Sequence, residues 1–199
     1  MKILFATKNP AKIEKFSKEL NKRGIEVITI SDLDFELDID ENGKNAIENA
    51  YLKASAYYEK TKIPTIGMDN NLFIENLSEE KQPGTYVRRV NGKTLTDDEM
   101  IEYYTQLVKD NGGKLVAKWV YGIVICKDEK KYEYTWSKEN FYFVDKSCNK
   151  RNPGYPLDSI TIIPEYNKYL AELTQEEKEL RNKKENNSDI LDFIENVLK

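Results

Sequence analysis

The sequence predicts an α/β protein in which helices cover a β-sheet. The chain opens with a short apolar segment, Lys2 to Phe5, then an amphipathic segment ending at Gly24, then a second β-rich segment, Ile25 to Ile30. A strand, a helix and a strand in this order are typical of a helix-covered sheet. Two long alternating segments, 115–126 and 131–144, add a predicted hairpin that turns at residues 127–130.

The segment after the first strand predicts a helix whose start can bind an anion. Pro10 suits the first helical turn, and apolar residues then recur at spacings of three and four, at Ile13, Phe16 and Leu20. Unpaired N–H groups and the positive end of the helix dipole attract anions at such a junction. Nearby side chains add donors: Thr7, Lys8, Asn9 and Lys12. These residues predict phosphate binding, with an ordinary strand–turn–helix and solvated lysines as the alternative.

A long helix and a third strand follow in the sequence. Residues 44–61 are mostly good helix formers, and Pro64 comes soon after them. Thr65 to Met68 predicts a strand that ends on Asp69, and Asp69-Asn70-Asn71 indicates a turn. A carboxylate at a strand tip is a usual place for a catalytic group in α/β folds, although such a turn also has a purely structural interpretation.

Six carboxylates fall within residues 32–41. A run of this kind usually keeps a loop in water. The alternative is that one or two of these side chains bind a hard cation, which takes oxygen ligands and tolerates a shell of water.

The second half of the chain predicts further helices and one more buried segment. Capping signals predict three helices that start at Thr96, Thr174 and Ser188. The apolar run 160–163 indicates a segment inside the core.

Composition limits the functional classes. The length of 199 residues predicts one domain, residues 1–199. The chain is 39% hydrophobic and 33% charged, and its net charge of −4 without a basic stripe predicts no nucleic-acid partner. No stretch is long enough to span a bilayer, which favours a cytoplasmic protein with no membrane partner. Cys126 and Cys148 form neither a disulfide framework nor a metal-binding spacing. Histidine is absent, so any chemistry must come from carboxylates, lysines, hydroxyls and a bound cation.

Several short motifs together resemble the inosine triphosphate pyrophosphatase family. They correspond to T-x-N-x-x-K at Thr7 to Lys12, E-N-A-x-x-K-A at Glu48 to Ala54, D-D-S-G-L at Met68 to Leu72, P-G-x-Y-S-A-R at Pro83 to Arg89, G-F-G-Y-D-P over Gly154 to Pro164, and A-E-L-T-x-E-E-K at Ala171 to Lys178. Each motif alone is a weak signal. Their collinear order, however, covers nearly the whole chain.

The resemblance implies an elongated mixed β-sheet flanked by helices, with two lobes around a central cleft, and a homodimer. It implies an enzyme that hydrolyses deaminated purine nucleoside triphosphates (ITP, dITP and XTP) to the monophosphate and pyrophosphate. Asp69 would then activate water. Asp40, three residues before Gly43, matches an acidic Mg²⁺ ligand of the family, with Glu41 as a neighbouring candidate for that role beside Asp69. The implied substrate contacts are Thr7, Lys8, Asn9, Lys12, Lys53, Asn70, Arg89, Tyr155, Asp158, Lys178, Lys183 and Lys184, with Tyr155 at the position of a phenylalanine that stacks on the base.

Two positions depart from the family pattern. Met68 replaces the first of two paired acids, and Asn182-Lys183-Lys184 replaces the base-reading S-H-R. Lysine still donates to a 6-oxo group, but it lacks the planar fork of arginine, so base discrimination should be looser. Two alternatives therefore stay open: a nucleotide-binding homologue that has lost turnover, and an enzyme on the same scaffold that takes a different nucleotide.

Overall fold

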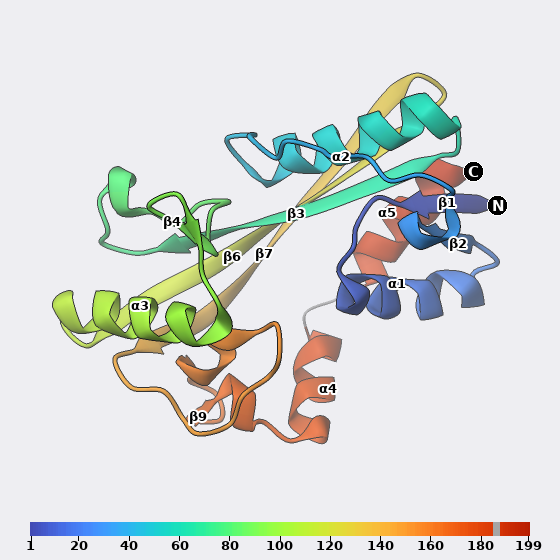
Figure 1. Ribbon diagram of the computed structural model, residues 1–199. Helices are drawn as coiled ribbons and strands as arrows, with labels where there is room; N and C mark the ends of the chain where they lie inside the picture. The colour runs from blue at the N-terminus through green and yellow to red at the C-terminus, as the bar shows by residue number, and fades with distance from the viewer. Residues whose placement is uncertain (185–187) are drawn as a thin grey trace. The chain divides into compact units, whose positions relative to one another are not determined.

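A computed structural model describes residues 1–184 and 188–199, apart from the side chains of Ala11, Lys15, Asn182, Lys183, Lys184 and Ser188 (Figure 1). The strands are β1 (Lys2–Phe5), β2 (Glu26–Thr29), β3 (Thr65–Ile74), β4 (Arg89–Val90), β5 (Lys93–Thr94), β6 (Lys114–Lys127), β7 (Lys130–Val144), β8 (Thr161–Ile163) and β9 (Lys168–Tyr169). The α-helices are α1 (Pro10–Lys22), α2 (Ala46–Thr61), α3 (Asp97–Asp110), α4 (Gln175–Lys184) and α5 (Ser188–Leu198). Short 3₁₀ turns are η1 (Ile30–Asp32), η2 (Glu79–Lys81), η3 (Pro156–Ser159) and η4 (Leu170–Glu172).

The main sheet is mixed. Its described strands follow the order β2-β1-β3-β6-β7-β8-β9, and β4 pairs with β5 in a separate two-stranded sheet. β1 is parallel to both β2 and β3, whereas β8 is antiparallel to β7 and β9. The predicted α/β class, a mixed sheet with flanking helices, is confirmed.

The chain divides into two compact units. Unit 1 comprises Met1–Asn70, Val120–Trp136 and Asn186–Lys199, and unit 2 comprises Asn71–Trp119 and Ser137–Glu185. β3, β6 and β7 each contribute residues to both units, and each unit has a hydrophobic core of its own.

Unit 1 is built around strands that are buried on both faces. Ile3 and Phe5 of β1 pack with apolar residues of α1 and α5, whereas Leu4 packs with Tyr57 of α2 on the other face. Figure 1 shows α2 on one side of β1 and α1 on the other. Neighbouring side chains of a strand point to opposite faces, so β1 has to be apolar at every position that is covered.

α2 lies unusually close to β3, and a glycine makes this possible. A Cβ atom placed on Gly67 would lie only 1.9 Å from the backbone oxygen of Ala50. Any side chain at position 67 would therefore push the helix away from the strand, and with it the polar residues that α2 carries.

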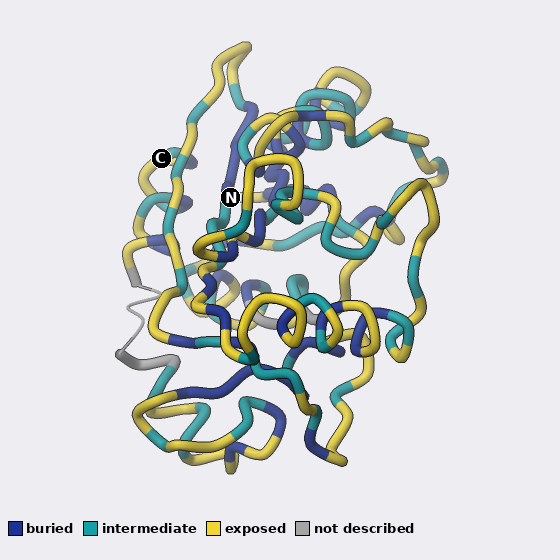
Figure 2. The backbone as a smooth tube through the Cα atoms, turned by 90° about the vertical axis from the view of Figure 1, so that its left-hand side faces the viewer, coloured by how far each residue is buried: buried dark blue, intermediate teal, exposed yellow. Residues whose placement is uncertain are grey.

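Unit 2 is organised around α3. Its buried face consists of Met100, Ile101, Tyr104 and Val108, which pack in one cluster with residues of β6, β7 and η3. Figure 2 shows buried and exposed residues alternating along the helices, as expected when one face of each helix packs against a core.

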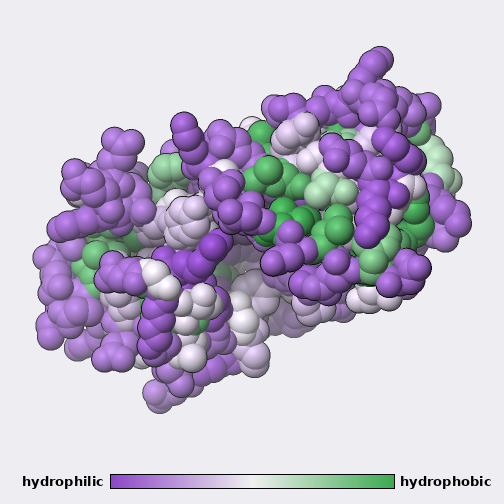
Figure 3. Space-filling view, turned by 45° about the horizontal axis from the view of Figure 1, so that its top comes forward, coloured by the Kyte–Doolittle hydropathy of each residue, from purple (hydrophilic) through white to green (hydrophobic). Residues whose placement is uncertain are grey.

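The surface is largely polar. The space-filling view in Figure 3 is mostly hydrophilic on the face that it shows, in keeping with a chain that is 33% charged. None of the described helices combines the length and the apolar character that a bilayer-crossing helix requires.

Most local predictions are confirmed. α1 begins at Pro10, and α3 follows a complete capping box formed by Thr96 and Glu99. The hairpin between β6 and β7 turns through Asp128 and Glu129, both with positive φ. At the start of α4, the Thr174 N–H donates to Glu177 at 2.8 Å, as a capping box requires. The predicted cap at Ser188 lies outside the described side chains.

Several predicted boundaries are wrong; α2, for example, begins at Ala46 rather than Lys44. β3 does not end in a turn at Asp69-Asn70-Asn71 but continues to Ile74. Leu72 holds the extension in place, because it exchanges two backbone hydrogen bonds with Gly84. Long-range pairing of this kind outweighs the local preference of asparagine for turns. β2 ends at Thr29 rather than Ile30, because Ile30 already belongs to a 3₁₀ turn.

Candidate active site

The start of α1 orients the first group of predicted substrate contacts. The N–H of Asn9 donates to Thr7 Oγ1 at 3.2 Å, and the N–H of Lys12 donates to Asn9 Oδ1 at 3.3 Å. Lys8 is exposed and forms an ion pair with Glu36. Glu36 belongs to the carboxylate-rich residues 32–41, here called the acidic segment. Thr7, Asn9 and Lys12 are therefore held at the positive end of a helix dipole.

A cluster of opposite charges lies between α2, β3 and the acidic segment in unit 1. Lys53 Nζ lies 2.7 Å from Glu41 Oε2 and 3.7 Å from Asp69 Oδ1. The side chains of Lys53 and Asp69 are only 13% and 17% exposed, so these charges interact with little screening by solvent. Asp69 is thus an interior strand residue with a cation beside it.

Lys12 belongs to the same cluster. Its Nζ donates to Asn70 Oδ1 at 3.4 Å. The pKa of Lys12 is lowered to about 8, chiefly by burial and also by the positive charge of Lys53, while Asp69 and Glu41 oppose the shift. Two lysines and two carboxylates of unit 1 therefore share one electrostatic environment.

The acidic segment is packed onto α2 rather than left loose in solvent. The N–H of Leu37 donates to the Tyr57 hydroxyl at 3.1 Å, and the Phe35 ring stacks on Tyr57 with centroids 6.1 Å apart. At the end of the segment, the N–H of Gly43 donates to the buried Asn49 Oδ1 at 2.8 Å. The apolar residues between the carboxylates thus fasten the segment and set the position of Glu41.

The two alternative metal ligands lie in different surroundings. Glu41 reaches Lys53, the lysine beside Asp69, whereas Asp40 is exposed and accepts a hydrogen bond from Asn42 at 3.0 Å. Among the residues that the structure describes, no three acidic or cysteine side chains gather as a preformed metal site. At this place the described residues therefore offer at most a pair of carboxylates.

The remaining predicted contacts lie in unit 2. Tyr155 is 46% exposed and immediately precedes η3, and Asp158 lies within that turn. Burial raises the pKa of Asp158, while the hydrogen bond from Asn152, at 2.8 Å, and the charges of Lys178 and Arg181 oppose the shift. These residues form a second polar group, on η3 and α4.

Three other predicted contacts in unit 2 are an arginine and two lysines. Arg89 is exposed, and its guanidinium carbon lies 4.9 Å from the centre of the Tyr86 ring. Lys183 and Lys184 belong to the last turn of α4, and their side chains lie outside the described part of the chain.

Sequence reasoning missed two charged residues of unit 2. Arg181 faces Asp158 together with Lys178, and their spacing of three residues, which places both on one face of a helix, could have indicated it. Asp97 bonds to residues from two different loops, and no local signal distinguishes it from other acids in a first helical turn.

The fold and these residues define the class: a mixed α/β protein in which a helix start and two clustered lysines are suited to phosphate groups, with a strand aspartate beside the lysines. The sequence model of the Ham1 family matches residues 3–186 of this chain, and the chain belongs to this family.

Relatives and a solved structure agree with this assignment. The chain is 32% identical over 190 residues to a dITP/XTP pyrophosphatase of Aquifex aeolicus, covering 89% of this chain and 88% of the relative. It is 29% identical over 198 residues to a dITP/XTP pyrophosphatase of Thermoanaerobacter pseudethanolicus, covering 100% of this chain and 96% of the relative. The solved structure of the Staphylococcus aureus Ham1 protein superimposes with a TM-score of 0.71 at 28% identity and covers 89% of each chain.

Proposed function

We propose that this protein is a nucleoside triphosphate pyrophosphatase that converts deaminated purine nucleotides (ITP, dITP and XTP) to the monophosphate and pyrophosphate. It is an enzyme of the class that hydrolyses acid anhydrides, as the names of its relatives indicate. The observation that carries the proposal is the charged cluster of unit 1, in which Asp69, Glu41, Lys53 and Lys12 meet beside the start of α1.

A hard cation suits the chemistry of this cluster. Glu41 and Asp69 both present carboxylate oxygens, and both already lie near a cation, the ammonium group of Lys53. Mg²⁺ commonly binds through one or two carboxylates and takes its other ligands from water and substrate phosphates. Glu41 and Asp69 would hold Mg²⁺, with Asp40 as the alternative to Glu41. When bound, the ion would neutralise phosphate charge and acidify water.

The residues of unit 1 supply the other requirements of the reaction. Attack of water on the α-phosphorus needs a group that accepts the proton of the water, and we assign this role to Asp69. Negative charge on the phosphate oxygens needs cations held in place in advance, a role that suits Lys12 and Lys53. Thr7, Lys8, Asn9 and Asn70 add hydrogen-bond donors for the triphosphate.

We assign recognition of the base to unit 2. Tyr155 is exposed and its ring suits stacking on a purine, while Asp158, Lys183, Lys184 and Arg89 supply polar contacts. Lys178 we assign to the triphosphate. Cationic donors favour a 6-oxo group over the donating 6-amino group of adenine. This chemistry supports a preference for deaminated purines.

A panel of nucleotides tests the proposal. The purified protein is incubated with Mg²⁺ and ITP, dITP, XTP, GTP or ATP, and pyrophosphate and orthophosphate are measured separately. We expect pyrophosphate from the 6-oxopurine nucleotides, with ITP and XTP preferred over ATP. Orthophosphate as the first product would contradict the proposed bond cleavage.

Substitution of Asp69 tests the assigned base. We expect Asp69→Asn to lose at least about 100-fold in kcat, in the range typical of removing a general base. Asp34→Asn is the matched control, because Asp34 is an exposed member of the acidic segment. An Asp69→Asn variant that folds normally and keeps its activity would refute the assignment.

One observation favours a second candidate, a nucleotide-binding protein without turnover. Met68, which replaces the first of the family's paired acids, is 4% exposed and packs in the apolar core of unit 1. The position therefore supplies no charge. Saturable binding of ITP without release of pyrophosphate would favour this candidate, and turnover of a modified nucleotide alone would favour an altered substrate.

We make three further proposals: that residues 1–199 act as one domain, that the protein is a homodimer, as the family resemblance implies, and that it works in the cytoplasm on free nucleotides. Light scattering during size-exclusion chromatography tests the dimer. A mass of one chain at micromolar concentration would refute it.

A further inference from the structure

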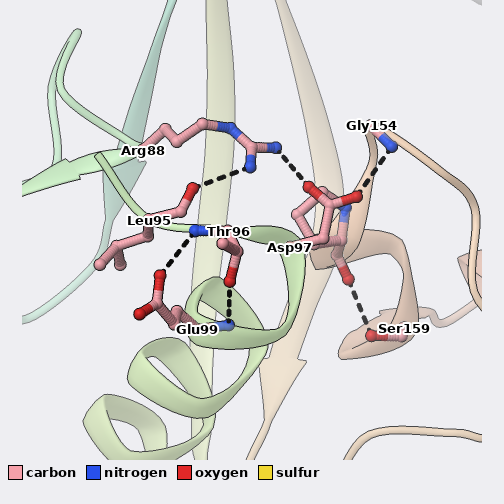
Figure 4. A network of polar contacts seen from close by, with 8 residues as sticks. Arg88, Leu95, Thr96, Asp97, Glu99, Gly154 and Ser159 are labelled. Atoms are coloured by element: carbon pink, nitrogen blue, oxygen red, sulfur yellow. Dashed lines mark hydrogen bonds and ion pairs between the residues drawn. The ribbon is translucent and has the colours of Figure 1, made fainter.

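Asp97 joins two loops of unit 2 through a single carboxylate (Figure 4). Its Oδ1 accepts a hydrogen bond from Arg88 Nη2 at 2.8 Å, and its Oδ2 accepts one from the N–H of Gly154 at 2.9 Å. Arg88 also donates to the backbone oxygen of Leu95 at 3.1 Å. The carboxylate therefore connects the segment before Arg89 with the segment before Tyr155.

This arrangement is not needed to start α3. Thr96 and Glu99 form the complete capping box of that helix, with Thr96 N–H to Glu99 at 2.8 Å and Glu99 N–H to Thr96 Oγ1 at 3.3 Å. Figure 4 shows the Asp97 side chain directed away from this box and toward Gly154. The cap and the connection between loops are thus separate functions of adjacent residues.

The bond to Gly154 acts on the backbone next to Tyr155. Gly154 has a φ of +79°, a conformation that residues with a side chain rarely adopt. The turn continues with Tyr155 N–H to Asn152 O at 2.9 Å and Asp158 N–H to Tyr155 O at 3.2 Å. The backbone of Tyr155 is therefore fixed on both sides, while the residue as a whole remains 46% exposed.

The contribution of the network to folding should be small. The side chains of Arg88 and Asp97 are 37% and 41% exposed, and ion pairs of this kind contribute little to stability. The hydrogen bond from Gly154, opposed by partial burial and aided by Arg88, keeps the pKa of Asp97 below its usual value, so its carboxylate stays ionised at neutral pH. A charged group held in this way is better explained by local positioning than by overall stability.

We propose that Asp97 is a positioning residue for base recognition, which holds the Tyr155 loop and the Arg88–Arg89 segment in the arrangement that receives the purine. The inference rests on the proposed function, because it deepens the role assigned to Tyr155 and Arg89. Asp97 itself does not contact the base. It limits the positions that the stacking ring can take, and so lowers the cost of ordering that ring when a nucleotide binds.

The test separates the base from the phosphates. Inhibition constants of IMP and of inorganic pyrophosphate are measured against ITP hydrolysis for the wild type and for Asp97→Ala. We expect the constant for IMP to rise about tenfold, with that for pyrophosphate changing less than about twofold, because only IMP carries a base. The preference for ITP over ATP should fall in parallel.

Three further variants complete the test, and the first of them is the control. Asp98→Asn is matched to Asp97 in charge and lies beside it in the first turn of α3, but it is exposed, so we expect wild-type constants. Asp97→Asn keeps an acceptor oxygen for Gly154 and should give an intermediate constant for IMP. Arg88→Met removes the other partner and should raise the IMP constant in the same direction.

The outcomes distinguish this inference from the proposed function. If the wild type releases no pyrophosphate from ITP, the proposed function fails, and calorimetric binding of IMP to the same variants then tests the positioning role alone. Unchanged affinity for IMP in Asp97→Ala would overturn the inference. Equal losses for IMP and pyrophosphate, together with a lowered melting temperature, would overturn it as well, since they would show a general structural role. If Asp97→Ala does not fold, Asp97→Asn and Arg88→Met carry the same test.

Discussion

Replacing Lys12 with methionine should make the protein more stable and less active. The pKa of Lys12 in the folded protein is about 8, against an ordinary value of 10.5. One pKa unit corresponds to about 1.4 kcal/mol, so the fold disfavours the charged form of this lysine by about 3 kcal/mol. Methionine keeps an unbranched apolar side chain and removes the charge. We expect a gain of up to about 3 kcal/mol in the free energy of unfolding near pH 7.

The dependence on pH provides an internal check of the sign. Because the folded pKa lies below the unfolded one, the unfolded chain binds more protons at Lys12 between about pH 8 and pH 10.5. The stability of the wild type should therefore rise relative to the variant across this range. The advantage of Lys12→Met should shrink as the pH approaches 10.5.

Urea unfolding at several pH values measures both effects, and the release of pyrophosphate from ITP measures activity. Lys18→Met is the matched control, since Lys18 is exposed on the same helix and its replacement should leave stability and activity nearly unchanged. We expect Lys12→Met to lose about 100-fold in activity, because a cation near the phosphates is removed. A variant less stable than the wild type at neutral pH, or a stability difference that does not change with pH, would refute the reasoning.

Three further changes test the surroundings of the site. Gly67→Ala should lower the free energy of unfolding by about 2–4 kcal/mol, because the new Cβ would overlap the backbone of Ala50; an unchanged urea midpoint would contradict the close packing of α2. Tyr57→Phe should cost about 1 kcal/mol by removing the hydroxyl that accepts from the N–H of Leu37, and a loss below about 0.3 kcal/mol would argue against that bond. Lys53→Met should lower kcat at least about 100-fold in the pyrophosphate assay, and full activity would remove Lys53 from the proposed site.

The individual elements could be predicted because their signals are local. Pro10 begins α1, Thr96 with Glu99 caps α3, and alternation defines the long hairpin. Each of these patterns involves residues within a few positions of one another, so the chain contains the full signal. The prediction failed at Asp69-Asn70-Asn71, where pairing of Leu72 with Gly84 extends the strand.

The sequence alone did not show which carboxylate of the acidic segment lies near the other predicted site residues. The resemblance placed Thr7, Lys12 and Asp69 in one site, and it matched a metal ligand to Asp40, with Glu41 as a neighbouring candidate. Packing of the acidic segment onto Tyr57 brings Glu41 to Lys53, whereas Asp40 stays exposed. No pattern of charges along the segment could have made this distinction.

The sequence by itself determined the class of fold, the family and the order of its polar motifs, since these depend on local propensity and on collinear residues. Only the tertiary structure decided the environment of each charge. The lowered pKa of Lys12 comes from burial and from the nearby Lys53, and Asp97 bonds to Gly154 from 57 positions away. Electrostatic interactions depend on distance and on exclusion of water, and both are set by contacts between residues far apart in the chain.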